Sequence, residues 1–155
     1  RFETGRLSLD RYLERTVFYR ERNFAKDVFK VYMFDQSRPM DGSLELADRL
    51  ARSGRYLMST LNNESRELNL YRIEHFELRK YFSLFMSSCF LGVKKPEDEM
   101  FRLALDLSQH EPEECLFIDD RQINLECAER LRLQTLHFKN APQLEKDLQK
   151  LGIKF

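Results

Sequence analysis

Two adjacent carboxylates, Asp119 and Asp120, directly follow the apolar run Cys115–Ile118. The run predicts a buried strand, and a helical pattern begins at Ile123. The pair would therefore lie at the carboxyl edge of a sheet, where α/β proteins bind ligands. Two neighbouring carboxylates repel each other unless a cation is near, and a hard metal ion such as Mg²⁺ is a natural partner. The alternative is that the pair caps the next helix in a solvated turn.

Possible oxyanion donors gather at the end of a second predicted strand, Tyr56–Leu61. The side chains of Thr60, Asn62 and Asn63 can each donate a hydrogen bond. The backbone N–H groups of the helix that follows would point the same way. An ordinary Asn-rich turn that caps this helix is the alternative.

A lysine pair lies in the segment formed by residues 92–96, before another predicted helix. Pro96 is expected in the first turn of that helix, where it would fix the backbone and so aim Lys95 from a defined position. An ammonium group there suits a phosphate or a carboxylate. A solvated lysine pair on the surface is the alternative.

The elements that must position these side chains alternate regularly between strand and helix. Strands are expected at Tyr56–Leu61, Leu84–Ser88, Cys115–Ile118 and Thr135–Phe138, and helices at Ser65–Phe76, Glu97–Leu107, Ile123–Leu131 and Gln143–Leu151. This order predicts an α/β fold with right-handed crossovers and a parallel sheet. The oxyanion donors, the lysine and the acid pair would then meet at one edge, an arrangement suited to phosphoryl transfer or a similar displacement.

The first part of the chain has a different pattern. Leu9, Leu13 and Val17 form the apolar face of a helix that Ser8 would cap, and a second helix rich in aromatic residues ends before Pro39. We expect a helical module over residues 1–42 and an α/β core over residues 43–155. The core would open with a helix at residues 43–53, closed by Gly54 in a left-handed conformation.

Bulk composition narrows the function classes. The 26 Lys and Arg residues balance 26 Asp and Glu residues, so no basic field favours nucleic acid or an anionic membrane as a partner. No apolar run approaches the roughly 20 residues that span a bilayer. Cys89, Cys115 and Cys127 lack metal-ligand spacing. Cys89 and Cys115 lie in apolar runs, and we expect them to be buried, reduced thiols of a cytoplasmic protein.

Three segments together resemble the haloacid dehalogenase (HAD) superfamily of hydrolases. Residues 61–63, residues 92–96 and residues 117–120 with Asn124 resemble the second, third and fourth motifs of that superfamily, in the same order. The resemblance covers roughly residues 50–155, and the helices before Pro39 are similar to the small helical cap of such proteins. It implies a Rossmann-like parallel core sheet with a cap.

The resemblance also implies a metal site. Asp120 would be the ligand of Mg²⁺, Asp119 would supply a second carboxylate, and Asn124 would support the metal from the outer shell.

Phosphate contacts are implied in the same way. Lys95 would neutralise the nucleophile and the phosphate, while Asn62 or Thr60 would hold the transferring oxygens with Asn63 beside them. The family normally has Ser or Thr at the position of Asn62, although an amide N–H₂ can also donate.

The first motif of the superfamily, an apolar strand ending in Asp-x-Asp, is not found in the chain. Asp35 follows an apolar run, but it is interpreted as a residue near a helix end, and Asp41-Gly42 as a turn. The chain opens on Arg1 without an initiator Met, as an interior piece would. We therefore expect the central first strand of the sheet, with the nucleophile, to lie upstream.

Two expectations about the chain alone follow from that gap. Without the nucleophile the chain alone would be inactive. Unpaired inner strand edges would leave it marginally stable or prone to self-association, unless a complementing segment fills the gap.

The parent protein is expected to be a Mg²⁺-dependent phosphatase that acts on a small phosphate ester through an aspartyl-phosphate. Dehalogenation is the lesser option, since it needs no metal. The alternative is a non-catalytic HAD-like module that binds a phosphorylated ligand or a protein.

Overall fold

The computed structural model describes residues 1–155 and contains four short parallel strands. They are β1 (Ser59–Asn62), β2 (Leu84–Ser87), β3 (Leu116–Asp119) and β4 (Gln134–His137). β1 pairs with β2, with Asn62 opposite Ser87, and β3 pairs with β4, with Asp119 opposite His137. The predicted parallel α/β fold is confirmed, and the carboxyl ends of β1 and β3 carry the expected polar residues.

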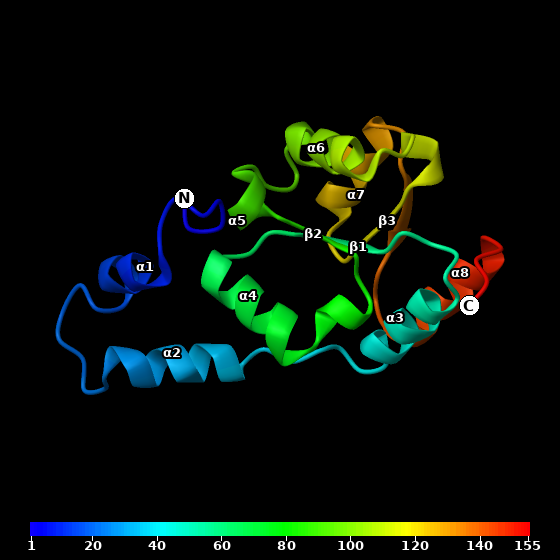
Figure 1. The fold of residues 1–155 in the computed structure, drawn as a ribbon. Helices are drawn as coiled ribbons and strands as arrows, with labels where there is room; N and C mark the ends of the chain where they lie inside the picture. Colours follow the sequence, from blue (N-terminus) through cyan, green and yellow to red (C-terminus); the bar gives the residue numbers. More distant parts are fainter.

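Helices cover both sides of these strands (Figure 1). They are α4 (Arg66–His75), α5 (Ser88–Leu91), α6 (Asp98–Ser108), α7 (Gln122–Arg130) and α8 (Ala141–Lys150), with short 3₁₀ turns at Leu78–Lys80 and Pro112–Glu114. In Figure 1, α4 lies on one side of β1 and β2, and α6 and α7 lie on the other. The predicted order of strands and helices is confirmed, with ends displaced by at most three residues.

Successive side chains of β3 point to opposite faces of the strand and contribute to two separate parts of the core. Phe117 points into a buried cluster with Phe101 of α6 and Leu125 of α7, and the two rings meet edge to face with centroids 5.1 Å apart. Leu116 and Ile118 point the opposite way, onto a second cluster formed by α3 and α8. Because both faces of β3 are packed, its carboxyl end is held rigidly.

β1 and β3 do not pair with each other. The four strands form two separate two-stranded ladders, and no backbone ladder joins them within residues 1–155. Leu61 of β1 nevertheless packs against the same buried cluster as Phe117. The expectation that a further strand lies between β1 and β3 stays a prediction.

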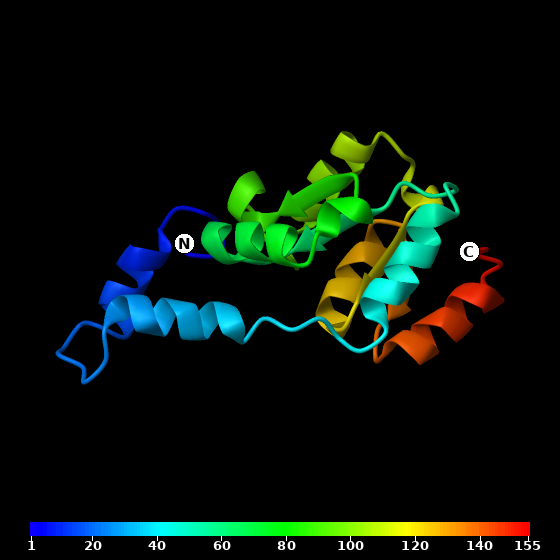
Figure 2. The same cartoon turned by 60° about the horizontal axis from the view of Figure 1, so that its bottom comes forward.

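The N-terminal helices are α1 (Leu9–Thr16), α2 (Lys26–Asp35) and α3 (Ser43–Arg52). The predicted cap of α1 is confirmed, because the Ser8 hydroxyl accepts a hydrogen bond from the Arg11 backbone N–H. Figures 1 and 2 show α1 and α2 projecting from the strands, whereas α3 packs beside α8. The division into a module over residues 1–42 and a core over residues 43–155 stays a prediction.

The aromatic pattern of α2 is only partly used for packing. Phe18, Phe24 and Phe29 form one aromatic cluster between α1 and α2. Val28 and Tyr32, which share the helical spacing of that face, are exposed, and α2 contains no buried residue. The apolar periodicity therefore predicts the helix correctly but overstates its burial.

Residues 1–6 lie against the core near α5 (Figure 1). Gly5 has φ +69°, and a Cβ built there would stand 2.4 Å from the carbonyl oxygen of Cys89, so only glycine fits this close approach. The backbone N–H of Leu9 donates to Oε1 of Glu67 at 2.9 Å. These contacts fasten the start of the chain to the α/β part.

Gly54 agrees with the sequence-based prediction, whereas α5 and Pro96 differ from it. Gly54 closes α3 with φ +64°, as predicted. The helix α5 was not predicted, because its four residues are too few to show periodicity. Pro96 does not lie in the first turn of a helix: α6 begins at Asp98 after the N-cap Glu97, so Pro96 cannot aim Lys95 in the way proposed from the sequence.

No helix in residues 1–155 combines the length and the apolar character required to cross a bilayer.

Candidate active site

Lys95 and Asp119 form a buried ion pair. Nζ of Lys95 lies 2.6 Å from Oδ2 of Asp119, and the two residues are only 9% and 8% exposed. The ammonium group also lies 5.3 Å from the centre of the Phe117 ring. The alternative of a solvated lysine pair is therefore wrong for Lys95, although it describes its half-exposed neighbour Lys94.

The second oxygen of Asp119 is also engaged. Oδ1 accepts hydrogen bonds from the backbone N–H of Arg121 and from Nδ2 of Asn124, each at 2.9 Å. Burial alone would raise the pKa of Asp119, but the hydrogen bonds from Lys95, Asn124 and the Arg121 backbone outweigh it and hold the pKa below its ordinary value. Asp119 is therefore an ionised carboxylate with both oxygens in use.

Asp120 is in a different environment. It is exposed, and its carboxylate makes no hydrogen bond or ion pair within residues 1–155. Its backbone carbonyl oxygen lies 3.0 Å from Nε2 of His137. The N-cap of α7 is Arg121, so neither acid takes the capping position that the alternative required. One carboxylate of the pair is bound by the protein and the other is free.

A hollow of about 440 Å³ opens beside the acid pair. It is lined by Met40, Ser43, Ile118, Asp119, Asp120 and Phe138. A larger hollow of about 610 Å³ lies between the starts of α3 and α8 and contains none of the predicted site residues. The hollow at the acid pair is the one that a ligand of Asp120 would enter.

The side chains around Asp120 supply only part of the oxygen ligands that a Mg²⁺ ion needs. No cluster of three or more His, Cys, Asp or Glu residues that could hold a metal ion occurs in residues 1–155. Magnesium usually keeps several waters, however, and needs only one or two carboxylates besides phosphate oxygens. Asp120 offers one free carboxylate, and Asn124 holds Asp119 in place while its own buried Oδ1 has no partner.

Asn62 points its amide towards α4. Its Nδ2 donates to Oδ1 of Asn69 at 2.9 Å, while its Oδ1 is buried without a partner. Thr60 lies two residues earlier on β1, so it shares the face of Asn62 at a deeper position in the strand. Asn69 was not singled out from the sequence. A signal was present, because Asn69 lies about one helical turn before Ile73 and therefore on the same buried face of α4.

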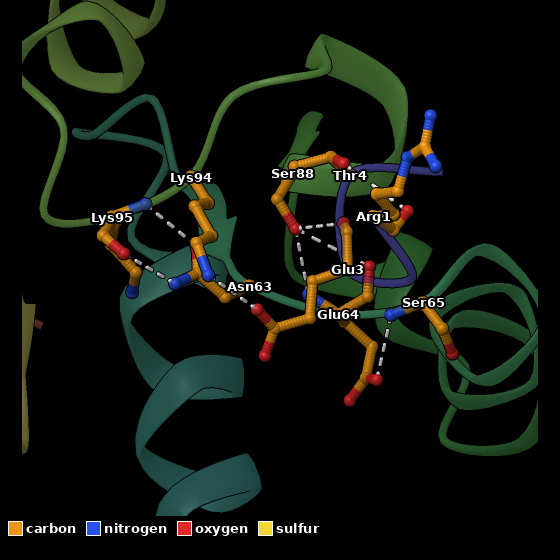
Figure 3. Close-up of polar contacts among 9 residues, drawn as sticks. All are labelled: Arg1, Glu3, Thr4, Asn63, Glu64, Ser65, Ser88, Lys94 and Lys95. Carbon is orange, nitrogen blue, oxygen red and sulfur yellow. Dashed lines mark hydrogen bonds and ion pairs between the residues drawn. The ribbon is translucent and has the colours of Figure 1, made fainter. Parts of the chain in front are cut away.

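Asn63 reaches across to the loop that carries Lys95 (Figure 3). Its Oδ1 accepts from the backbone N–H of Lys95, and its Nδ2 donates to the backbone carbonyl oxygen of Lys95, both at 2.8 Å. The Asn-rich cap alternative is wrong, because the N-cap of α4 is Ser65 and no side chain caps it. No local sequence pattern could have shown a contact between residues 32 positions apart.

Asp35 and Asp41, the two acidic residues that were not assigned to the first motif, lie in the local structures predicted for them. Asp35 is the last residue of α2, and Asp41-Gly42 forms the turn before α3, with φ +75° at Gly42. The three thiols are free, and Cys89 is buried as predicted, whereas Cys115 is only partly buried. Burial raises the pKa of Cys127 to about 11, with Asp98 adding to the effect.

A family model described as a haloacid dehalogenase-like hydrolase matches residues 3–132. The chain belongs to this family. The match spans most of the chain, and it includes the ends of β1 and β3 and the Lys95 loop. The resemblance drawn from the three motifs is thereby confirmed at the level of the family.

Two curated relatives of this HAD-like chain are named as a hydrolase and a phosphatase. The chain is 32% identical over 152 residues to chloroplastic flavin mononucleotide hydrolase 1 of Arabidopsis thaliana, covering 98% of this chain and 61% of the relative. It is 29% identical over 117 residues to glyceraldehyde 3-phosphate phosphatase of Pyrococcus furiosus, covering 75% of this chain and 48% of the relative. The chain therefore spans less than two thirds of the length of either relative.

A solved structure supports the fold. A HAD family enzyme of Bacteroides thetaiotaomicron, in complex with magnesium and inorganic phosphate, superposes with a TM-score of 0.79 at 20% identity. The similarity covers 90% of this chain and 73% of that enzyme. At this identity it shows that the HAD-like chain shares the α/β architecture of the enzyme.

Proposed function

We propose that the parent protein is a Mg²⁺-dependent HAD-type phosphatase that hydrolyses a small phosphate ester. The observation that carries the proposal is the buried Lys95–Asp119 pair at the carboxyl end of β3, where the next residue, Asp120, has a free carboxylate. A fixed ammonium group and a free acid at one sheet edge suit a dianionic phosphoryl group and its metal ion. The names of the two relatives support the same reaction class.

The phosphoryl group would be bound by side chains of the Lys95 loop and of the carboxyl end of β1. Lys95 would neutralise its charge from a site where water is largely excluded, which strengthens the interaction. Asn62 or Thr60 would donate to a phosphoryl oxygen, with Asn63 beside them. No step requires these groups to change charge, so their contribution is binding and orientation.

Asp120 would hold the metal ion, with Asp119 and Asn124 supporting it from behind. When bound, Mg²⁺ would offset the negative charge of the phosphoryl oxygens. The Bacteroides thetaiotaomicron enzyme, which was solved in complex with magnesium and inorganic phosphate together, supports this cofactor. The hydrogen bonds from Lys95 and Asn124 would keep the acid pair oriented before the ion arrives.

We further infer that the nucleophile comes from a strand upstream of residue 1. The unpaired inner edges of β1 and β3 offer backbone donors and acceptors for one more parallel strand. An Asp at its carboxyl end would attack phosphorus, the ester oxygen would leave, and water would then hydrolyse the aspartyl-phosphate. The chain alone would be inactive and marginally stable.

The test compares two lengths of the protein. The 155-residue chain and the protein with its upstream residues are assayed with p-nitrophenyl phosphate in Mg²⁺. Turnover by the longer form and none by the shorter one is expected. Turnover by the shorter form would show that the nucleophile lies within residues 1–155.

A non-catalytic binding module is the second candidate. It is favoured by the amide of Asn62 at a position where the family normally has Ser or Thr; its N–H₂ group donates one of its two hydrogens to Asn69 and keeps the other for a ligand. Equilibrium binding of inorganic phosphate without turnover by the longer form would support this candidate. The cytoplasmic location and the exclusion of nucleic acid and membrane partners stay predictions from the sequence, as does self-association.

A further inference from the structure

Both polar ends of the Asn63 side chain are used by one distant residue. Lys95 offers a backbone N–H that can only donate and a carbonyl oxygen that can only accept, and Asn63 meets each of them at 2.8 Å (Figure 3). The orientation of the amide is therefore fixed by its partners. The same amide is poorly placed to serve as a primary contact to an incoming substrate.

Lys95 depends on this contact because its loop has little other support. Residues 92–97 lie outside helix and strand, and the only backbone hydrogen bond inside that stretch joins Glu97 N–H to the Lys94 carbonyl oxygen. The backbone N–H and carbonyl groups of Lys95 bond only to Asn63. A lysine side chain has four flexible carbons, so the position of its ammonium group depends on where its backbone is held.

Asn63 is itself held from the other side. The backbone N–H of Glu64 donates to the hydroxyl oxygen of Ser88 at 3.0 Å, and this buried hydroxyl donates to the carbonyl oxygen of Glu3 at 2.6 Å. The carboxylate of Glu3 lies 3.1 Å from Nζ of Lys94. Figure 3 shows that Glu3 thereby connects the Lys94–Lys95 segment with Ser88 and, through Ser88, with the Asn63–Glu64 segment.

We propose that Asn63 is a positioning residue that fixes the backbone of Lys95, so that the ammonium group of Lys95 stands at Asp119 when the phosphoryl group arrives. The inference rests on the proposed function for its consequence in catalysis. It gives Asn63 a different role from the direct substrate contact expected from the sequence.

A double-mutant cycle separates the two roles. In the longer, active form of the protein, Asn63→Leu removes both hydrogen bonds to Lys95 and should lower kcat/KM for p-nitrophenyl phosphate by about 10- to 100-fold, as a misplaced catalytic group does. In a Lys95→Met background the same change should alter kcat/KM by less than about twofold, because nothing remains to be positioned. An equal loss in both backgrounds would overturn the proposal in favour of a direct substrate contact.

A second readout does not need turnover. Amide hydrogen exchange at Lys95, followed by NMR, should accelerate at least about tenfold in Asn63→Leu, because its acceptor is lost. It should accelerate less in Asn63→Asp, which keeps an oxygen for the Lys95 N–H but sets its second oxygen against the Lys95 carbonyl oxygen. Unchanged protection in Asn63→Leu would overturn the proposal even if the protein proves to be a phosphatase.

Controls keep the outcomes distinct. Asn23→Leu makes the same substitution at an exposed residue and should leave both readouts unchanged. If Lys95→Met turns over too slowly, the cycle is completed with the affinity for inorganic phosphate, read by ³¹P NMR. No turnover by the wild type together with faster exchange in Asn63→Leu would contradict the proposed function but retain the contact between Asn63 and Lys95.

Discussion

Nζ of Lys95 lies 2.6 Å from Oδ2 of Asp119, in a place where both side chains are nearly excluded from water. The other oxygen of Asp119 is bound by Asn124 and by the Arg121 backbone. Asp119 is therefore an internal partner of Lys95, and Asp120 is the acid that faces solvent. The two adjacent carboxylates have different environments, and each role predicts a different response to mutation.

Loss of the ammonium group should destabilise the protein. Lys95→Met leaves Asp119 buried without its cation, and breaking a buried pair in this way costs about 3 kcal/mol or more. The free energy of unfolding, measured by urea denaturation, should fall by that amount. The double variant Lys95→Met/Asp119→Asn should recover part of the loss, and a double variant that is less stable than Lys95→Met would contradict the ion-pair interpretation.

The contribution of Asp119 to stability should depend on pH in one direction. Its pKa is lowered in the folded protein, so the stabilisation is fully present above the unfolded-state pKa and is lost as pH falls through the folded-state pKa. The stability difference between the wild type and Asp119→Asn should be constant from about pH 7 to 5 and shrink below about pH 4. Urea denaturation in EDTA at several pH values measures this difference in the free energy of unfolding. A difference that grows on acidification would contradict the prediction.

Asp120 should matter for the metal ion rather than for folding. Since its exposed carboxylate makes no hydrogen bond or ion pair within the chain, Asp120→Asn should change the free energy of unfolding by no more than about 0.5 kcal/mol. The Mg²⁺ concentration needed for half-maximal turnover should rise at least about tenfold, because one carboxylate ligand is weakened. Asp119→Asn is the matched comparison, and it should lower stability more than Asp120→Asn does.

Asn69 should control how Asn62 meets a ligand. Asn69→Leu removes the side-chain partner of Asn62, and the lost hydrogen bond should cost about 1 kcal/mol of stability. Because Asn62 then becomes mobile, KM for p-nitrophenyl phosphate should change several-fold, while the Mg²⁺ requirement should not. Steady-state kinetics with a thermal melt measures both, and an unchanged KM would place Asn62 outside the phosphate site.

Much of the architecture was accessible from the sequence because it rests on local patterns. The apolar run before Asp119 and the alternation of strands with helices predict a parallel sheet with the acid pair at its edge. The burial of Lys95 was not accessible, because it depends on Asn63 after β1 and on Asp119 and Phe117 of β3, which are distant from Lys95 in the sequence. Pro96 suggested a different cause for the placement of Lys95, and the contact with Asn63 replaces it.

The exposed side of α2 shows that the sequence can also predict burial where the structure has none. Val28 and Tyr32 recur at helical spacing, and periodicity alone cannot distinguish a buried apolar face from one left open. The pairing of Asn62 with Asn69 was likewise invisible, since it joins a strand end to the second turn of a helix. Local order was predictable here, and contacts between elements were not.

The most direct test of the central claim is the metal dependence of turnover by the protein with its upstream residues. With p-nitrophenyl phosphate as substrate, we predict hydrolysis that EDTA abolishes, that added Mg²⁺ restores, and that Asp120→Ala reduces at least about a hundredfold at any Mg²⁺ concentration. Hydrolysis unaffected by EDTA or by Asp120→Ala would contradict a Mg²⁺-dependent phosphatase site at Asp120.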